Sequence, residues 1–406
     1  TKLPRMMTGT SKPRQYEAAL SKAGLAFVGP ALATGIAYID PGNVATNLTG
    51  GARFGYSLIW VIVFANIGAW LVQYLAAKLA IASGKSMAEL LGKQFKKRWL
   101  RLLYWLQAEA MILATELAEV VGGAIALHLL FNLNPIFGAL LIGAAAFLIL
   151  SLARNEKVGI FITVVVALMA VTIIGFVSSL FTSQIDAAAA ALGLVPQISQ
   201  RDELFLALGI LGATIMPHAI YVHSALTAEK FGKAKDEDKR KLMKWTKLDV
   251  SVAMAIAGIA NIGILLVGAV TVAGDVPVIT IDSAVSHISD FHGQIFGTMF
   301  AIGLLASSLA SSAVGGYAGA SVMSGLTNLK INARVRRLIS IVPSVLILAV
   351  VPDSTAVLVI SQIVLAFGLP LALGPLVWLT GQVRVMGKYV NSLGTKVAAL
   401  ALLVTL

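Results

Sequence analysis

Long runs of apolar residues recur along the whole chain and restrict its possible folds more than any other feature. Each run is about 20 residues long, the length that an α-helix needs to cross the hydrocarbon core of a bilayer. The composition agrees, because 58% of the residues are hydrophobic and only 12% are charged. We therefore expect an all-α, polytopic membrane protein.

The placement of the basic residues predicts how the chain is oriented. Its net charge of +12 would by itself also fit a nucleic-acid-binding protein. The Lys and Arg residues, however, gather in segments after alternate apolar runs, as the positive-inside rule describes. We expect eleven spans in the plasma membrane, an amino terminus in the cytoplasm, the lipid bilayer as surroundings, no nucleic acid and no obligatory protein partner.

The spans divide the chain into two sets of five. The expected order is a cytoplasmic segment at 1–22, spans 1 to 5 at 23–182, an outside loop at 183–203, spans 6 to 10 at 204–380, and a cytoplasmic loop with the start of span 11 at 381–406. Gly50–Tyr56 is expected to form an outside loop, and the highly charged Glu229–Lys247 an inside loop. Because five is odd, the second set must be inverted in the membrane relative to the first.

Two spans are interrupted by proline. The first contains Asp40-Pro41-Gly42-Asn43, and the sixth contains Met216-Pro217-His218. Proline removes a backbone donor and glycine weakens a helix, so we expect both spans to unwind at these points. Breaks at corresponding places in two inverted halves indicate the binding site of a secondary transporter, near the bilayer midplane.

The chemistry of the breaks favours a metal cation. The oxygens of Asp40 and Asn43, with carbonyl groups freed by the first break, form a cup for a cation at membrane depth. The chain has no cysteine, so a soft ligand must be Met or His, and the Met216 thioether would favour transition metals over Mg²⁺ and Ca²⁺. The alternatives are a kinked packing helix with a neutralised Asp40, and a Met216 that merely fills a gap.

Protons require titratable groups of their own. In span 3, Glu116 and Glu119 lie three residues apart on one helical face, and Glu109 lies a turn or two away. His218 lies two residues beyond Met216. Together with Asp40, these groups form a candidate proton pathway.

The motifs around these residues resemble the Nramp family of proton-coupled divalent transition-metal transporters, and its bacterial manganese-importing branch most of all. The resemblance covers essentially the whole chain. It is carried by the tetrad Asp40–Asn43, Gly212–His218, Ser361-Gln362, Thr115–Glu119 and Arg336-Arg337.

The resemblance implies a LeuT-like fold with two inverted five-helix repeats and an eleventh span. It implies that Asp40, Asn43 and Met216 are side-chain ligands of the metal. It also implies that Ala213 is a carbonyl ligand in some states and that Gln362 is a ligand in an outward-facing state. It also adds Arg337 to the proton pathway, as a partner in a salt bridge. A purely structural ion pair between Glu119 and Arg337 is the competing interpretation.

The expected function is alternating-access import of Mn²⁺, and also of Fe²⁺, Co²⁺ and Cd²⁺, together with protons. The metal and the protons are then substrates, and we expect neither a cofactor nor enzymatic activity. One alternative is a transporter of amino-acid-like organic solutes on the same scaffold, although Asp40 in the cup disfavours an anionic group there. Others are a metal channel or a sensor, and the sequence contains no large soluble region to serve as a sensor's signalling domain.

Overall fold

The structure is a computed structural model that describes residues 29–151, 158–271, 280–327, 333–351 and 354–406, without the side chains of 158, 333–338 and 340. Throughout these residues the regular structure is helical, with no β-strand. In the first half of the chain the helices are α2 (Pro30–Gly35), the 3-10 helix η1 (Ile36–Ile39), α3 (Pro41–Phe54), α4 (Ile59–Ser83), α5 (Met87–Gln94), α6 (Arg98–Phe131), α7 (Pro135–Ser151), α8 (Val158–Val177) and the 3-10 helix η2 (Ser178–Thr182).

The second half of the chain continues the helical pattern. Its helices are α9 (Ala187–Leu192), α10 (Arg201–Thr214), α11 (Pro217–Phe231), α12 (Asp236–Thr271), α13 (Ile281–His292), α14 (Gln294–Thr327), α15 (Ala333–Val350), α16 (Ser354–Thr380), α17 (Val383–Met386), the 3-10 helix η3 (Gly387–Tyr389) and α18 (Leu393–Thr405).

The apolar helices correspond in order to the predicted spans. Within the described ranges, seven helical segments are long and apolar enough to cross a membrane. Four shorter apolar segments lie at Pro30–Ile39, Pro135–Ser151, Ile341–Val350 and Leu393–Thr405. The two sets together supply one segment for each of the eleven predicted spans, which confirms a polytopic helical membrane protein.

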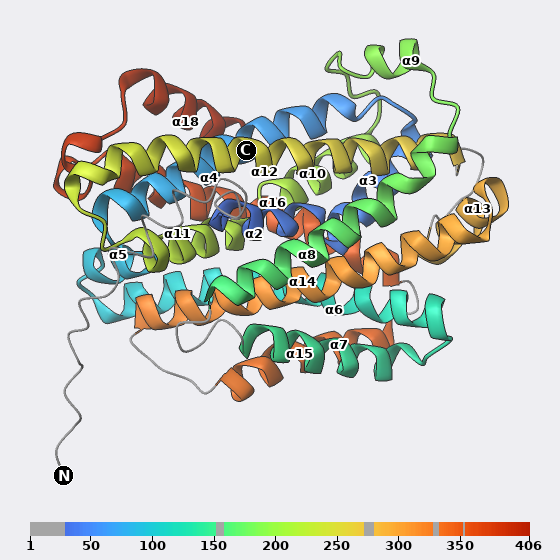
Figure 1. The fold of residues 1–406 in the computed structure, drawn as a ribbon, viewed down its shortest axis with the longest axis horizontal. Helices are drawn as coiled ribbons and strands as arrows, with labels where there is room; N and C mark the ends of the chain where they lie inside the picture. Colours follow the sequence, from blue (N-terminus) through green and yellow to red (C-terminus); the bar gives the residue numbers. More distant parts are fainter. Residues whose placement is uncertain (1–28, 152–157, 272–279, 328–332, 352–353) are drawn as a thin grey trace.

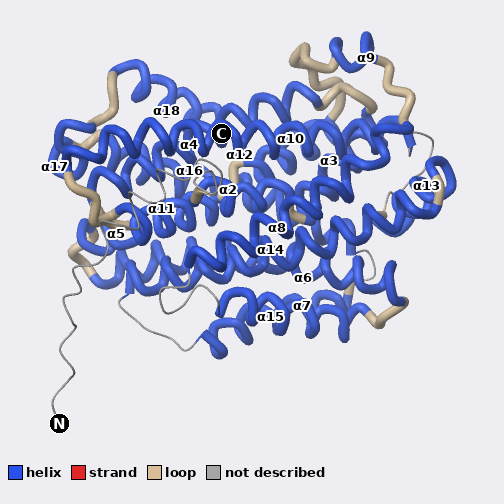
Figure 2. The backbone as a smooth tube through the Cα atoms, viewed as in Figure 1, coloured by secondary structure: helices blue, strands red, loops and turns tan. Residues whose placement is uncertain are grey.

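Most of these helices run along the long axis of the molecule (Figure 1). The segments α2, α3, α10 and α16 occupy the middle, with α4 and α12 on one side and α6 and α14 on the other. Short helices mark the two ends: α5 and α17 lie at one end, and α9 and α13 at the opposite end (Figure 2). Segments predicted to share a side of the membrane therefore lie at the same end of the molecule.

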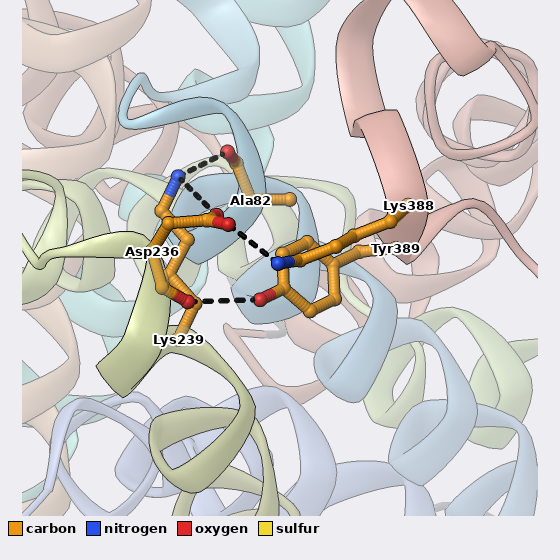
Figure 3. A network of polar contacts seen from close by, with 5 residues as sticks. All are labelled: Ala82, Asp236, Lys239, Lys388 and Tyr389. Atoms are coloured by element: carbon orange, nitrogen blue, oxygen red, sulfur yellow. Dashed lines mark hydrogen bonds and ion pairs between the residues drawn. The ribbon is translucent and has the colours of Figure 1, made fainter.

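A polar network ties three segments together at the end that contains α17 (Figure 3). Lys388 donates a hydrogen bond to the Asp236 carboxylate, and the Tyr389 hydroxyl donates to the Asp236 carbonyl at 3.1 Å. Lys239 donates to the carbonyl of Ala82 at 3.0 Å. These contacts hold the segment after α16 against the start of α12 and the end of α4.

Two predicted loops are partly helical. The prediction of a loop at Gly50–Tyr56 was wrong for residues 50–54, because α3 continues to Phe54. Gly51 lacks a side chain where a Cβ would lie 1.9 Å from the carbonyl oxygen of Leu265, so α3 packs directly on the backbone of α12. This close packing stabilises a helix that the glycine pair by itself disfavours.

The charged segment Glu229–Lys247 is also largely helical, because α12 already begins at Asp236. Three acidic residues, Asp236, Glu237 and Asp238, occupy its first turn, where negative charge stabilises a helix. At 36 residues, α12 exceeds the ~20 residues that cross a bilayer. Its charged first turns therefore extend beyond the apolar span.

Candidate functional site

The first break lies at Asp40, between the 3-10 helix η1 and helix α3. Asp40 is extended (φ −75°, ψ 169°) and caps α3, and its Oδ1 accepts hydrogen bonds from the backbone N–H and the side-chain Nδ2 of Asn43, both at 2.8 Å. Pro41 is the first residue of α3, where its missing N–H costs no helical hydrogen bond. The predicted break is confirmed, but the tetrad starts a helix instead of lying in an unwound segment.

The second break separates α10 from α11 at Ile215 and Met216. Ile215 (φ −102°, ψ 66°) leaves the helical region, and Met216 is the N-cap of α11, which begins at Pro217. Asn43 joins the two breaks, because its Nδ2 donates to the carbonyl of Ala213 at 2.9 Å and its Oδ1 accepts from the Thr214 hydroxyl at 3.4 Å. Asp40, Asn43 and Ala213 therefore meet at one place, although Asn43 and Ala213 are 170 residues apart in sequence.

Gln362 reaches the same place from α16. A Cβ built on Gly42 would lie 2.1 Å from Gln362 Nε2 and 3.0 Å from Asp40 Oδ2, so the Gln362 carboxamide lies against the first turn of α3. Within the described residues, neither Asp40 Oδ2 nor Gln362 Oε1 accepts a hydrogen bond, although both atoms are buried. Buried acceptors without donors are costly in the absence of a cation. The arrangement can therefore bind a cation.

Met216 is buried at the second break. It has no solvent-exposed surface, and it belongs to the main apolar core as well as to the break. Among the described residues, no three His, Cys, Asp or Glu side chains form a group that could hold a metal. A metal site here must therefore combine the single carboxylate of Asp40 with amide, carbonyl or thioether ligands.

The predicted proton-pathway residues lie beside the second break and along α6. His218 and Thr115 are in hydrogen-bond contact at 3.3 Å between Nδ1 and Oγ1, and Glu116 interacts electrostatically with His218. Glu119 faces α14, where a Cβ on Gly315 would lie 3.0 Å from its Oε2. Glu109, on the same helix, is also buried.

The side chain of Arg337 lies outside the described residues. Its predicted pairing with Glu119 therefore stays a prediction.

The sequence interpretation missed a second set of buried polar residues around the first break. Gln73 of α4 donates to the hydroxyl of Tyr38 and contacts Nδ1 of His223 at 2.7 Å. Asn261 of α12 donates to the carbonyl of Tyr38 at 2.7 Å and accepts from Asn47 at 2.9 Å. The sequence did contain a signal for these residues. Gln73 and Asn261 are uncharged polar residues within apolar spans, a costly placement that is usually functional.

Two adjacent serines of α14 connect the first break with α6. The Ser307 hydroxyl donates to the carbonyl of Ile39, and the Ser308 hydroxyl donates to the carbonyl of Glu119. The carbonyl of Ile39 belongs to the residue directly before Asp40. These bonds fix the backbone of the break relative to the helix that carries the glutamates.

Comparison with known proteins places these features in a family. A family model described as "Natural resistance-associated macrophage protein-like" (Nramp) matches residues 31–406. The divalent metal cation transporter MntH of Mycobacterium tuberculosis is 45% identical over 369 residues, which are 91% of this chain and 86% of the relative. The protein of the same description from Deinococcus radiodurans is 39% identical over 395 residues, covering 95% and 87%.

Solved structures agree on the fold. A manganese transporter of Eremococcus coleocola superimposes with a TM-score of 0.84 at 27% identity, covering 98% of this chain and 86% of that one. A transporter of the nucleobase-cation-symport-1 family superimposes with a TM-score of 0.53 at 16% identity, covering 93% and 87%, and supports the fold alone.

The two broken spans and the superimposed structures define a LeuT-like fold, and the matched family and relatives are membrane transporters, not enzymes. The match over residues 31–406, together with relatives 39–45% identical, shows more: the chain belongs to the Nramp family.

Proposed function

We propose that this chain imports divalent transition-metal ions together with protons across the plasma membrane by alternating access, with its amino terminus in the cytoplasm. Mn²⁺ is the principal substrate, and Fe²⁺, Co²⁺ and Cd²⁺ are further ones. The ligands are Asp40, Asn43, Met216 and Gln362, with the carbonyl of Ala213. The names of the relatives, divalent metal cation transporter and manganese transporter, support the substrate class.

One observation carries the proposal. Asp40 Oδ2 and Gln362 Oε1 are buried acceptors without hydrogen-bond donors among the described residues, and they lie where the two breaks meet. A carboxylate and an amide oxygen suit a divalent cation, whereas an anionic solute would be repelled by Asp40. The Met216 thioether at the same junction favours transition metals over Mg²⁺ and Ca²⁺.

Burial favours a carrier over a channel. Asp40, Asn43, Met216 and Gln362 each have no solvent-accessible surface. A channel needs a water-accessible path past its selectivity residues, whereas a carrier passes through states in which the site is closed to both sides. In such a carrier, Asp40, Glu116, Glu119 and His218 would accept and pass on protons. Arg337, which stays protonated, would serve the same pathway as a partner in a salt bridge.

The test is transport by the purified chain in liposomes that hold a pH-sensitive dye. We expect uptake of Mn²⁺ that saturates with concentration and acidifies the interior only when the metal is present. Uptake that rises linearly with Mn²⁺ would instead identify a channel. Saturable uptake without acidification would remove the proton from the proposal but leave metal transport standing.

A further inference from the structure

Gln362 is held between the two broken spans by two glycines. A Cβ on Gly212 of α10 would lie 2.0 Å from the backbone carbonyl oxygen of Gln362, and a Cβ on Gly42 of α3 would lie 2.1 Å from its side-chain Nε2 and 2.4 Å from its Cδ. Real Cβ atoms do not approach other atoms so closely. Gln362 therefore occupies the space that a side chain would need at each glycine. Its backbone lies against Gly212 and its carboxamide against Gly42.

The two close approaches differ in whether the neighbouring atoms can move to make room for a Cβ. Beside Gly212 the neighbours are backbone atoms of α16, which cannot move without shifting the helix. Beside Gly42 the neighbour is the tip of a flexible side chain, which can rotate away. An added methyl group at Gly42 is therefore expected to displace the carboxamide and to leave the fold in place.

The displaced carboxamide is the group that completes the acceptor cluster. Nε2 of Gln362 donates to the hydroxyl of Ser361 at 3.0 Å, which leaves Oε1 as the acceptor without a donor in the described part of the chain. Asp40 Oδ2 lies on the same side of Gly42, 3.0 Å from the position of the added Cβ. The bare Cα of Gly42 is thus the surface on which the carboxamide and the carboxylate come together.

We propose that Gly42 is a positioning residue for metal transport: only glycine at this position lets the Gln362 carboxamide sit beside Asp40 at the metal cup. The inference rests on the proposed function and adds a structural requirement to it. Helix propensity acts in the opposite direction, because alanine is favoured over glycine inside a helix. A loss of function on Gly42→Ala is therefore not explained by weaker helix formation.

The test is a double-mutant cycle in Mn²⁺ uptake by proteoliposomes, with Gly42→Ala, Gln362→Ala and the double variant. Because each single change removes the same uncharged ligand, the Gln362 carboxamide, from the metal cup, each should raise KM for Mn²⁺ by about three- to tenfold. The double variant should match Gln362→Ala, because the methyl group has no carboxamide left to displace. Calorimetric titration of the purified variants with Mn²⁺ should show the same pattern in Kd.

Two glycines provide matched controls. A Cβ on Gly35, in the other half of the same span, would have its nearest neighbours at 3.5 Å, and a Cβ on Gly50, further along α3, would lie 3.3 Å from a Leu58 methyl group. Gly35→Ala and Gly50→Ala should therefore keep the KM of the parent.

The proposal is overturned if Gly42→Ala keeps the parent's KM, or if its effect multiplies with that of Gln362→Ala. It is also overturned if Gly42→Ala and the double variant both take up no Mn²⁺ while Gln362→Ala alone still does, because the damage would then lie in Asp40 or the backbone. These outcomes differ from failure of the proposed function, in which the parent itself takes up no Mn²⁺.

Discussion

At the scale of single residues, three polar side chains organise the centre of the molecule. One carboxylate oxygen of Asp40 caps α3, and the other lies beside Gly42, as the carboxamide of Gln362 does. The side-chain amide of Asn43 donates hydrogen bonds to Asp40 and to the carbonyl of Ala213. The same residues that hold the breaks together thus present the acceptors, so a change in any one alters both structure and chemistry.

Met216 is expected to set selectivity. Mg²⁺ and Ca²⁺ gain little from a thioether, whereas Mn²⁺ gains somewhat and Cd²⁺ gains more. Met216→Ala should therefore retain Mn²⁺ transport and should weaken Cd²⁺ transport more than Mn²⁺ transport. It should also let Ca²⁺ or Mg²⁺ compete with Mn²⁺. A change of about 1.4 kcal/mol in relative binding would shift the competition tenfold.

The measurement for Met216 is Mn²⁺ uptake in excess Ca²⁺ or Mg²⁺. A buried Met→Ala change also costs about 2–5 kcal/mol of stability, so the thermal transition of the variant must be recorded alongside. If the folded variant rejects both ions as well as the parent does, Met216 packs the core and selectivity arises elsewhere.

At the scale of elements, the short helix α2 depends on a residue far away in the sequence. Asp249 of α12 accepts a hydrogen bond from the backbone N–H of Ala31 at 3.1 Å, in the first turn of α2. Gly29 leaves space for this carboxylate, since a Cβ there would lie 1.9 Å from Asp249 Oδ2. A tertiary contact therefore supplies the cap that α2 lacks in its own sequence.

Loss of this cap should loosen α2. Removing a capping acceptor costs about 0.5–2 kcal/mol, which raises the fraction of time that α2 is undocked by roughly 2- to 30-fold. The chain has no cysteine, so Ala33→Cys places a single thiol on the buried face of α2. Asp249→Ala should speed its labelling by a thiol reagent, whereas Asp249→Asn, which keeps an acceptor oxygen, should do so less. Equal labelling in all three backgrounds would show that Asp249 does not hold α2.

The contact between η3 and α12 predicts a pH dependence. The hydrogen bond and charge of Asp236 raise the pKa of Lys388 above its usual value. A raised lysine pKa contributes stability at pH values below the unfolded pKa, and this stability is lost as the pH rises through the folded pKa. Lys388→Ala should therefore change the thermal transition by the same small amount at neutral and mildly acidic pH, and the difference should vanish in strong alkali. It should also vanish in strong acid, because the same contact lowers the pKa of Asp236 and is lost when that carboxylate is protonated. A difference that disappears near pH 7 would contradict this assignment.

Prediction from sequence succeeded where a local cause acts. Pro41 and Pro217 lack a donor, and each begins a helix after a break, as their chemistry requires. The contacts from Gln73 to Tyr38 and from Asn261 to Tyr38 were not predicted, because they join residues 35 and 223 positions apart through packing alone. The same limit applies to Gln362, which only the resemblance to a family brought to the site.

At the scale of the whole molecule, the account requires two substrates to be coupled. Glu119 and His218 are buried near the second break or along α6, and neither is a proposed metal ligand. Glu119→Gln and His218→Ala should therefore reduce proton entry more than Mn²⁺ entry, which lowers the ratio of protons to metal in dye-loaded proteoliposomes. A parallel loss of both fluxes at an unchanged ratio would assign these residues to gating or stability.

The central claim is that the junction of the two breaks binds the transported metal, and Asp40 tests it most directly because it brings the junction's carboxylate. The decisive measurement is the initial rate of Mn²⁺ uptake by Asp40→Ala, at equal reconstituted protein and with a retained thermal transition. Asp186→Ala, which removes an exposed carboxylate at the N-terminus of α9, serves as the control and should transport like the parent. The account predicts that Asp40→Ala shows no uptake above that of empty liposomes. Saturable Mn²⁺ uptake by Asp40→Ala at a rate near that of the parent would contradict it.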